Sequence, residues 1–348
     1  MVVDDQLARY ADRAGRALII GGCPRSGTTL LRTMLHCHPE VAIPRETRFV
    51  LESWRRRRTF GDLGEEANRI RLAKWIFMRE ETQADRLGIE TDEAISRLAV
   101  APPTLGSLLA TCFVMFADKE GKPRWGDKRP MYAERLATML ELFPSAHFIH
   151  VVRDPRACVA SLRKLGWFEG HIPPMAELWE RSLNGVQRCR RTLAPDQLLE
   201  VRYEDLVSDP ERIAPQVAAF AGITADESAV ESMLRYHEYD ETRDEQYHSN
   251  LRRPIDPSRI SEWQDALSAE EIAFVEQATR PLMLRWGYEP VADGVSVPPA
   301  LLREFGKQRR RQMLARWRRG LNNEWQKRVT ERRPLAAEVP VVAGGPAG

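Results

Sequence analysis

The sequence predicts an α/β fold, a parallel sheet with helices on both faces, and two observations support this prediction. Residues 16–22 (RALIIGG) and 146–152 (AHFIHVV) are short apolar runs, each followed by a turn and by apolar residues at helical spacing. Leu198 to Val201 supplies a third short run. Apolar strands that alternate with helices are typical of a parallel sheet buried on both faces, because right-handed crossovers place helices there.

Length and composition agree with a folded globular protein. The chain has 348 residues, of which 43% are hydrophobic and 29% charged, so it can bury a substantial core. Lys plus Arg number 52 and Asp plus Glu number 50, a net charge of +2 that gives no sign of a nucleic-acid partner. The charge is unevenly distributed, because residues 303–333 hold 12 basic and 3 acidic residues. That segment is electrostatically different from the body of the protein.

The chain divides into one large domain and a C-terminal extension. We expect an α/β domain over residues 1–300, with a helical cap inserted at about 61–117, where no strand pattern occurs. Residues 301–333 carry apolar side chains spaced mostly by three or four among basic ones, which predicts a basic amphipathic helix. Peripheral membrane contact and homodimer contact are both open for this helix. Residues 334–348 are small, apolar and glycine-rich, which predicts a disordered tail.

The cysteines and the N-terminus bear on cellular location. The five cysteines are odd in number and scattered, with no close pair typical of a redox or zinc motif. A reducing cytosol is the simplest environment for such a set. The N-terminus has no secretory signal, and no run of 18 apolar residues occurs. We therefore expect a cytoplasmic protein that associates with a membrane only peripherally, if at all.

The segment GCPRSGTT, residues 22–29, has the glycine spacing of a P-loop. In such loops successive backbone N–H groups and a helix N-terminus converge on a phosphate. Its polar residues favour anion binding over an ordinary strand-to-helix connection. The loop residues expected to bind are Arg25, Ser26, Gly27, Thr28 and Thr29. Together with the parallel sheet, the loop predicts a three-layer, P-loop NTPase-like fold.

The loop lacks the lysine of a nucleoside-triphosphate enzyme. Thr28 stands at that position, and the positive charge lies on Arg25 inside the turn. Without the lysine, and with no acidic strand end obviously placed for Mg²⁺, kinase or ATPase chemistry loses its main charge compensation. A terminal monophosphate-type group suits this loop better. A P-loop kinase of small molecules and a non-catalytic nucleotide-binding scaffold are the alternative hypotheses.

Three motifs, in this order, resemble those of the sulfotransferases that use 3′-phosphoadenosine 5′-phosphosulfate (PAPS). PRSGTTLL, residues 24–31, resembles the family's 5′-phosphosulfate loop. RDPRACVASL resembles its 3′-phosphate element, in which Arg153 and Ser161 match an arginine and a serine eight positions apart. Tyr203 in RYEDLV resembles a tyrosine near the nucleotide. The resemblance covers roughly residues 18–290 and implies that PAPS is the co-substrate.

Within this family the chain is similar to the tyrosylprotein sulfotransferase branch and its bacterial relatives, with a match that extends over residues 25–50. The resemblance implies that Glu46 is the catalytic base and that Arg48 binds substrate. It also implies that Lys128, in GDKRP, stabilises the transferring sulfuryl group. The branch has a second arginine for acidic peptides four positions after the first, whereas this chain has Glu52 there. Glu52 argues against an acidic peptide acceptor.

These residue types suit sulfuryl transfer to a hydroxyl group. Charge builds on the departing oxygen, so fixed cations at that centre, for which Arg25 and Lys128 are the candidates, are the main catalytic resource. Glu46 can take the hydroxyl proton only within direct hydrogen-bond reach. Arg252 and Arg253, in the loop NLRRPI, are further candidates for the 3′-phosphate. We expect no metal, no nucleic-acid partner, and a hydroxyl acceptor on a small molecule, glycan, lipid or peptide.

Overall fold

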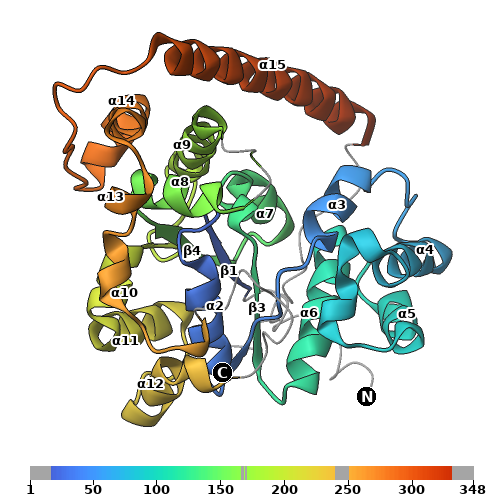
Figure 1. Cartoon of the computed structure of the whole chain (residues 1–348). Coiled ribbons are helices and arrows are strands. Elements are labelled where there is room, and N and C mark those ends of the chain that lie inside the picture. The colour runs from blue at the N-terminus through green and yellow to red at the C-terminus, as the bar shows by residue number, and fades with distance from the viewer. Residues whose placement is uncertain (1–16, 166–167, 169–170, 240–250, 331–348) are drawn as a thin grey trace, which may run out of the picture.

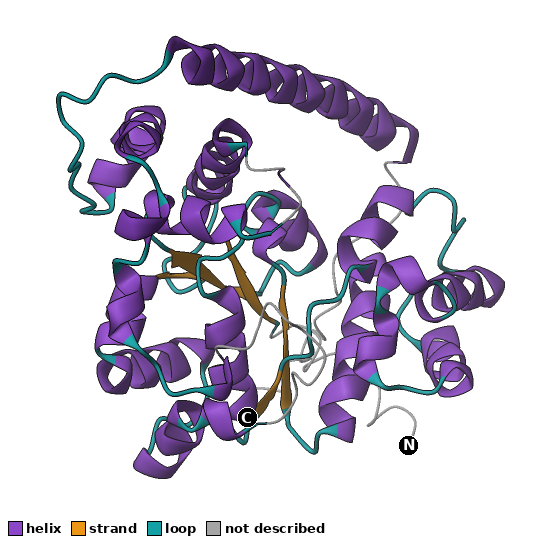
Figure 2. Ribbon diagram, viewed as in Figure 1, coloured by secondary structure: helices purple, strands orange, loops and turns teal. Residues whose placement is uncertain are grey.

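The computed structural model describes residues 17–165, 168, 171–239 and 251–330. Among these residues, five strands form a fully parallel sheet in the order β2-β3-β1-β4-β5 (Figures 1 and 2). The strands are β1 (Leu18–Gly22), β2 (Val41–Ala42), β3 (Arg124–Lys128), β4 (His147–Val152) and β5 (Leu198–Arg202). Helices lie on both faces of the sheet, so the predicted α/β fold is confirmed.

The central strand β1 contributes to two cores, because successive side chains of a strand point to opposite faces. Ile19 and Ile20 are both fully buried, but they belong to different apolar clusters. The helices on the Ile19 face include α6 (Leu105–Lys119) and α7 (Leu136–Leu142). Those on the Ile20 face include α2 (Thr28–Cys37), α11 (Pro210–Ala221) and α12 (Glu227–Leu234).

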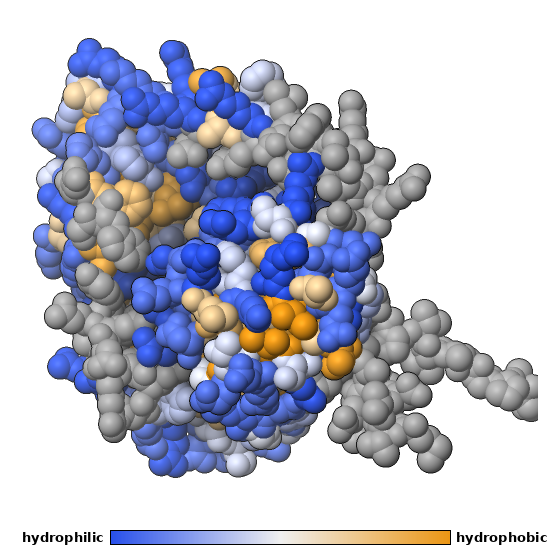
Figure 3. All heavy atoms as spheres, turned by 90° about the vertical axis from the view of Figure 1, so that its right-hand side faces the viewer, coloured by the Kyte–Doolittle hydropathy of each residue, from blue (hydrophilic) through white to orange (hydrophobic). Residues whose placement is uncertain are grey.

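A helical layer fills the predicted cap region, on the right of Figure 1. Its helices are α3 (Phe49–Arg56), α4 (Glu66–Phe77), α5 (Thr91–Val100) and α6. Thr104 caps α6 by accepting a hydrogen bond from the Ser107 backbone N–H, and the helix is buried from Leu105 to Ala117. The layer shares one apolar core with β1 and β3. Its outer face is mostly blue in Figure 3, with an orange hydrophobic patch near the centre of the view. The predicted domain boundaries stay a prediction.

A second group of helices, all after β4 in the sequence, completes the described part of the fold. Its helices are α8 (Pro155–Arg163), α9 (Ile172–Cys189), α10 (Tyr203–Ser208), α13 (Trp263–Ala266), α14 (Ala269–Arg285) and α15 (Pro299–Thr330). The long helix α15 crosses the top of the molecule in Figure 1. It coincides with most of the predicted basic helix, while the predicted tail at 334–348 lies outside the described residues.

Candidate active site

The predicted site residues gather at the carboxyl edge of the sheet, where ligands bind in open α/β folds. β1 ends at Gly22, immediately before the phosphate loop, and β3 ends at Lys128. In the parallel register Ile20 pairs with Lys128, and Gly22 pairs with Val151. Arg153 directly follows β4. The register therefore brings three segments that are distant in sequence to one edge.

The phosphate loop ends at a helix N-terminus that carries no acidic side chain. Gly27 precedes α2 with φ 93°, a left-handed conformation that favours glycine. No side chain caps α2, and its first turn has no acidic residue, so its N–H groups and dipole suit an anion. The hydroxyl of Ser26 is buried without a hydrogen-bond partner among the described residues. These features fit a phosphate-type ligand.

Tyr203 packs directly on the loop. A Cβ atom added to Gly27 would lie 2.4 Å from Tyr203 Cδ2, so only glycine leaves room for this ring. Arg153 Cζ lies 4.2 Å from the centroid of the same ring, a cation–π contact. The structure therefore places three predicted residues, from three separate motifs, in one cluster.

Arg25 lies with the residues predicted for the 3′-phosphate. Its Nε donates to Ser161 Oγ at 3.0 Å, and Arg153 Nη1 donates to the Arg25 carbonyl oxygen at 3.0 Å. Burial, and then the charge of Arg153, lower the pKa of Arg25. An anion between the two guanidinium groups would relieve their repulsion. The predicted role of Arg25 beside the transferring group stays a prediction.

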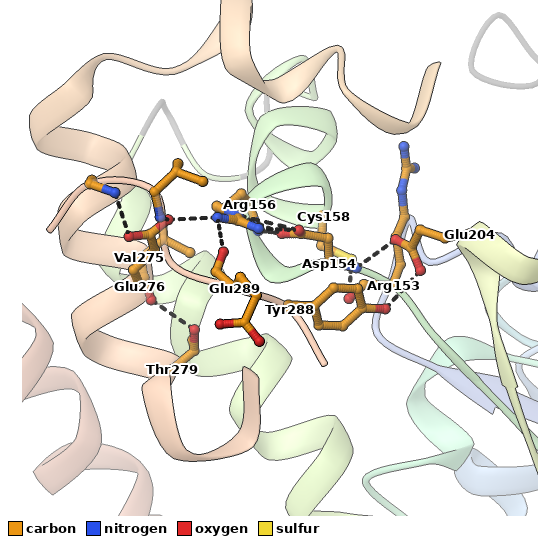
Figure 4. Close-up of polar contacts among 12 residues, drawn as sticks. Arg153, Asp154, Arg156, Cys158, Glu204, Val275, Glu276, Thr279, Tyr288 and Glu289 are labelled. Atoms are coloured by element: carbon orange, nitrogen blue, oxygen red, sulfur yellow. Dashed lines mark hydrogen bonds and ion pairs between the residues drawn. The ribbon is translucent and has the colours of Figure 1, made fainter. Parts of the chain in front are cut away.

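A buried polar network holds the segment that carries Arg153 (Figure 4). The Asp154 carboxylate accepts from the Arg156 backbone N–H at 2.8 Å and from its guanidinium at 2.6 Å. Arg156 Nη1 also donates to Glu276 Oε1 at 2.6 Å. The backbone N–H of Asp154 donates to Glu204 Oε1 at 3.0 Å. The network therefore fixes the N-terminus of α8 next to the predicted phosphate site.

Glu46 and Lys128 form a second polar cluster on the same edge. Lys128 Nζ donates to Glu46 Oε2 at 3.1 Å and to Thr29 Oγ1 at 3.3 Å. The Lys128 side chain is 3% exposed and that of Glu46 is 35% exposed. The cation is therefore buried beside the loop, while the carboxylate remains open to an incoming hydroxyl group.

Two arginines that the sequence analysis did not single out hold the segment with Glu46. Arg32 Nε, on α2, donates to the carbonyl oxygens of Ile43 at 2.9 Å and Pro44 at 3.1 Å. Arg86 Nη1 donates to the carbonyl oxygen of Glu46. Their partners are backbone carbonyl groups of a distant segment, so no local sequence pattern marks these arginines.

Arg259 is a further cation near the loop that the sequence analysis missed. It lies in a short 3₁₀ helix, η7 (Pro257–Ile260), and its Nε donates to Glu262 Oε1 at 2.7 Å. Its positive charge contributes to lowering the pKa of Arg25, after burial and the charge of Arg153. The only available signal was its position in the same arginine-containing C-terminal loop as the predicted pair.

The other predicted arginines lie at the surface. Arg48 is exposed at the start of α3, and its backbone N–H donates to the Thr82 carbonyl oxygen at 2.9 Å. Arg252 and Arg253 are exposed, and the carbonyl oxygen of Arg253 accepts from the Tyr236 hydroxyl at 2.8 Å. The loop contacts described above do not include these three side chains, whose roles stay predictions.

Asp127 is a buried acid immediately before Lys128. Its Oδ2 accepts a hydrogen bond from the Tyr132 hydroxyl, and burial is the main cause that raises its pKa from 3.8 to about 6. Arg129 and Glu46 are the other charged groups that act on it. Because the folded-state pKa is raised, the neutral acid favours folding. Its stabilising effect is present below pH 3.8 and is lost as the pH rises through about 6.

We expect Asp127→Asn to remove this pH dependence, since asparagine accepts the same hydrogen bond without a charge. Relative to the parent chain, the free energy of unfolding should rise by about 2.4 kcal/mol between pH 4 and pH 8. Urea unfolding at both pH values measures the difference. Asp118→Asn, at a residue with a 41% exposed side chain, is the control. A stability difference for Asp127→Asn that is equal at both pH values would contradict this account.

Within the described part of the chain, no group of three or more His, Cys, Asp or Glu side chains could hold a metal ion. The polar groups that the structure does bring together are cations, hydroxyl groups and the solvent-accessible carboxylates of Glu46 and Glu262. This donor set matches anion binding and proton transfer.

Comparison with known protein families identifies the family of this chain. Residues 17–227 match the sequence profile of the sulfotransferase family. The chain belongs to the sulfotransferase family. The motifs on which the resemblance rested lie inside the matched region, so the family prediction is confirmed.

Curated relatives of this sulfotransferase include animal enzymes named for tyrosine. A protein-tyrosine sulfotransferase of Drosophila melanogaster is 24% identical over 314 residues, which cover 87% of this chain and 56% of that protein. Protein-tyrosine sulfotransferase A of Caenorhabditis elegans is 26% identical over 289 residues, which cover 81% of this chain and 70% of that protein. The chain thus spans little more than half the length of the Drosophila relative.

Solved structures with the same fold include two sulfotransferase domains. The domain from the Synechococcus PCC 7002 olefin synthase is 24% identical with a TM-score of 0.55, over 79% of this chain and 94% of that one. The domain from the curacin biosynthetic pathway is 20% identical with a TM-score of 0.53, over 79% of this chain and 99% of that one. At such identities the likeness concerns the fold, and it agrees with the predicted P-loop-like architecture.

The predicted cytoplasmic location of this sulfotransferase is wrong. The relatives are animal protein-tyrosine sulfotransferases, which are not cytoplasmic enzymes. The prediction rested on scattered, unpaired cysteines, and four of the five free cysteines are buried in the fold. Buried thiols pack as small apolar groups, so they do not report the compartment. In the described residues no helix has both the length and the apolar character to cross a membrane.

Proposed function

We propose that this chain transfers the sulfuryl group of PAPS to an acceptor hydroxyl, with Glu46 as general base. The observation that supports this most strongly is the presence of two different polar clusters on one sheet edge. Arg25, Arg153 and Ser161 form the first, which suits a phosphate. Lys128 and Glu46 form the second, which suits a reacting centre that needs a cation and a base.

The first cluster fits a donor with a second phosphate. Arg25, Arg153 and Arg259 come from three separate segments. Glu262 pairs with Arg259, which leaves three positive charges against one negative charge. A phosphate monoester carries nearly two negative charges at neutral pH, so it complements this excess. ATP has no 3′-phosphate that these arginines could bind, so the cluster favours PAPS over ATP.

The 5′ end of the donor fits the loop itself. The N–H groups at the start of α2 and the hydroxyl groups of Ser26 and Thr29 are donors for the phosphosulfate oxygens. Thr29 Oγ1 lies 3.3 Å from Lys128 Nζ, which joins the donor site to the reacting centre. The sulfuryl group would therefore lie between the loop and Glu46.

The proposed reaction uses one cation and one carboxylate for separate tasks. The acceptor oxygen attacks sulfur as the bond to the bridging phosphate oxygen breaks, which gives a sulfate ester and adenosine 3′,5′-bisphosphate. Lys128 stabilises the charge that develops on the departing oxygen. Glu46 takes the hydroxyl proton on Oε1, because its Oε2 accepts the hydrogen bond of Lys128, while the nearest cation to Oε1, Arg129 Nε, is 3.8 Å away.

The acceptor site begins at Arg48, which is exposed two residues after the proposed base. The names of the curated relatives make a tyrosine peptide the first acceptor to assay. Glu52 forms an ion pair with Arg55 on α3, which adds a carboxylate near this entrance. A tyrosine without acidic neighbours is therefore the peptide of choice, alongside small phenols and alcohols.

Calorimetry with the reaction product tests the donor assignment. We expect adenosine 3′,5′-bisphosphate to bind more tightly than AMP or ATP. Arg259→Ala should weaken binding of the bisphosphate about tenfold or more, because a charged hydrogen bond contributes about 1.5–3 kcal/mol, and should leave AMP binding unchanged. Tighter binding of ATP than of the bisphosphate would contradict the donor assignment and favour the kinase alternative.

Arg235→Ala is the matched control for Arg259→Ala. Arg235 forms the same kind of pair, at i,i+3, with Glu238, and both side chains are more than half exposed. Its removal should not change the affinity for the bisphosphate. An unchanged affinity of Arg259→Ala would show that Arg259 takes no part in binding, even where the parent chain binds as expected.

A further inference from the structure

The long helix α15 is attached to the body by its first turns. Phe305 is buried in an apolar cluster that includes Phe274, with the two ring centroids 5.6 Å apart. Arg309 Nε lies 3.7 Å from Glu180 Oε2 on α9. Beyond Arg309, none of the described side chains of α15 is buried. The helix continues across the top of the molecule toward α3 (Figure 1).

Three large apolar side chains are exposed on this second part of α15. Met313 is 63% exposed, Leu314 52% and Trp317 63%. Trp317 is four residues after Met313 and three after Leu314, so it shares a side of the helix with each of them and joins the three into one apolar group. Grouped apolar side chains of this size at a surface mark a contact with another molecule.

The apolar group lies within a stretch without acidic residues. From residue 305 to residue 323 the sequence has basic side chains and no Asp or Glu. Arg310, Arg311 and Arg318, on either side of the apolar group, are exposed. In Figure 3 the upper end of the molecule, where α15 lies, is mainly blue with a few orange and tan side chains. The surface therefore combines positive charge with an apolar centre.

We propose that this second part of α15 binds an anionic lipid surface. Met313, Leu314 and Trp317 enter the headgroup region, and the arginines that flank them pair with lipid phosphates. A nucleic acid or polysaccharide would use the arginines but leave the apolar group in water. A second copy of α15 would bring like charges together. This inference does not rest on the proposed sulfuryl transfer.

Vesicle flotation with the full chain tests the proposal. The probes are vesicles of phosphatidylcholine alone and of phosphatidylcholine with phosphatidylserine, at low and high salt. We expect binding to the anionic vesicles, at least about tenfold weaker binding to neutral ones, and release by salt. The double variant Leu314→Ala/Trp317→Ala and the double variant Arg310→Gln/Arg311→Gln should each weaken binding about tenfold or more.

Met78→Ala and Val100→Ala are matched controls, since these apolar side chains are 66% and 69% exposed elsewhere on the surface. They should not change vesicle binding. Thermal unfolding and the affinity for adenosine 3′,5′-bisphosphate should be unchanged in the α15 variants, which separates a lost contact from misfolding.

Several results would overturn the proposal. Equal binding to neutral and anionic vesicles would remove the role of charge. Full vesicle binding by Leu314→Ala/Trp317→Ala would remove the role of the apolar group. A dimer in sedimentation velocity that this double variant abolishes would assign the surface to a second copy instead.

Discussion

Glu46→Gln is expected to lower kcat for sulfuryl transfer by about 10²- to 10⁴-fold, the usual contribution of a general base. Glutamine has the same size and can still accept the hydrogen bond of Lys128, which is 3.1 Å from Oε2 in the parent chain. It cannot take a proton from the acceptor. The affinity for adenosine 3′,5′-bisphosphate should therefore stay near that of the parent chain. Initial rates with labelled PAPS, together with calorimetry of the product, measure both quantities.

Glu52→Gln is the control for Glu46→Gln. Glu52 is also a partly exposed carboxylate that pairs with a cation, here Arg55 on α3. With a small phenol as acceptor the control should retain kcat, because Glu52 is not bonded to Lys128 and its proposed effect concerns only the charge of a peptide acceptor. If Glu46→Gln transferred sulfuryl at the parent rate, the proposed base would be wrong. If both variants lost activity equally, the general charge of this region would matter instead of the proton acceptor.

Glu276→Ala is expected to lower the free energy of unfolding by about 3–5 kcal/mol, the cost of breaking a buried ion pair on one side. Glu276 is 3% exposed and its partner Arg156 is 5% exposed, with 2.6 Å between Nη1 and Oε1 (Figure 4). Glu276 also accepts from the backbone N–H groups of Val291 at 2.9 Å and Ala292 at 3.1 Å. Alanine leaves a buried guanidinium and two buried N–H groups with fewer acceptors. Urea unfolding measures the loss.

Asp293→Ala is the matched control for this second prediction. Asp293 pairs at 3.2 Å with Arg280, which lies on α14 as Glu276 does. The Asp293 and Arg280 side chains are 72% and 49% exposed. An exposed pair of this kind contributes below about 1 kcal/mol. If Glu276→Ala and Asp293→Ala destabilised the protein equally, the buried network would not be the element that holds α8 and α14 together.

The strands with continuous apolar runs could be predicted from the sequence, whereas β3, which has no such run, could not. β1, β4 and β5 match runs that the sequence marks clearly. β3, with the sequence RWGDK, has no such run, yet it lies between β1 and β2. Gly126 allows close packing there, because an added Cβ would lie 2.6 Å from the Leu18 carbonyl oxygen. Its polar residues lie at the carboxyl edge of the sheet. They are buried there although their polar sequence is typical of an exposed segment.

The candidate site residues came from the sequence, but their arrangement in space did not. Glu46 and Lys128 are 82 positions apart, and only the resemblance linked them before the structure placed them in contact. Arg259 lies in the same arginine-containing loop as the predicted Arg252 and Arg253, and the sequence of the loop does not show which of these side chains points inward. Burial around the loop, rather than spacing, distinguishes Arg259, which is half-buried where the other two are exposed.

The amino-acid sequence by itself determined the strand-and-helix alternation, the P-loop-like motif and the family, because each depends on residues close together in the chain. Only the tertiary structure decided which distant side chains meet. The parallel register places Lys128 beside β1, and Arg153 packs against Tyr203 at the loop. The physical reason is that a hydrogen bond or ion pair depends on separation in space. Sheet register and helix packing set that separation, and neither is written in any short stretch of sequence.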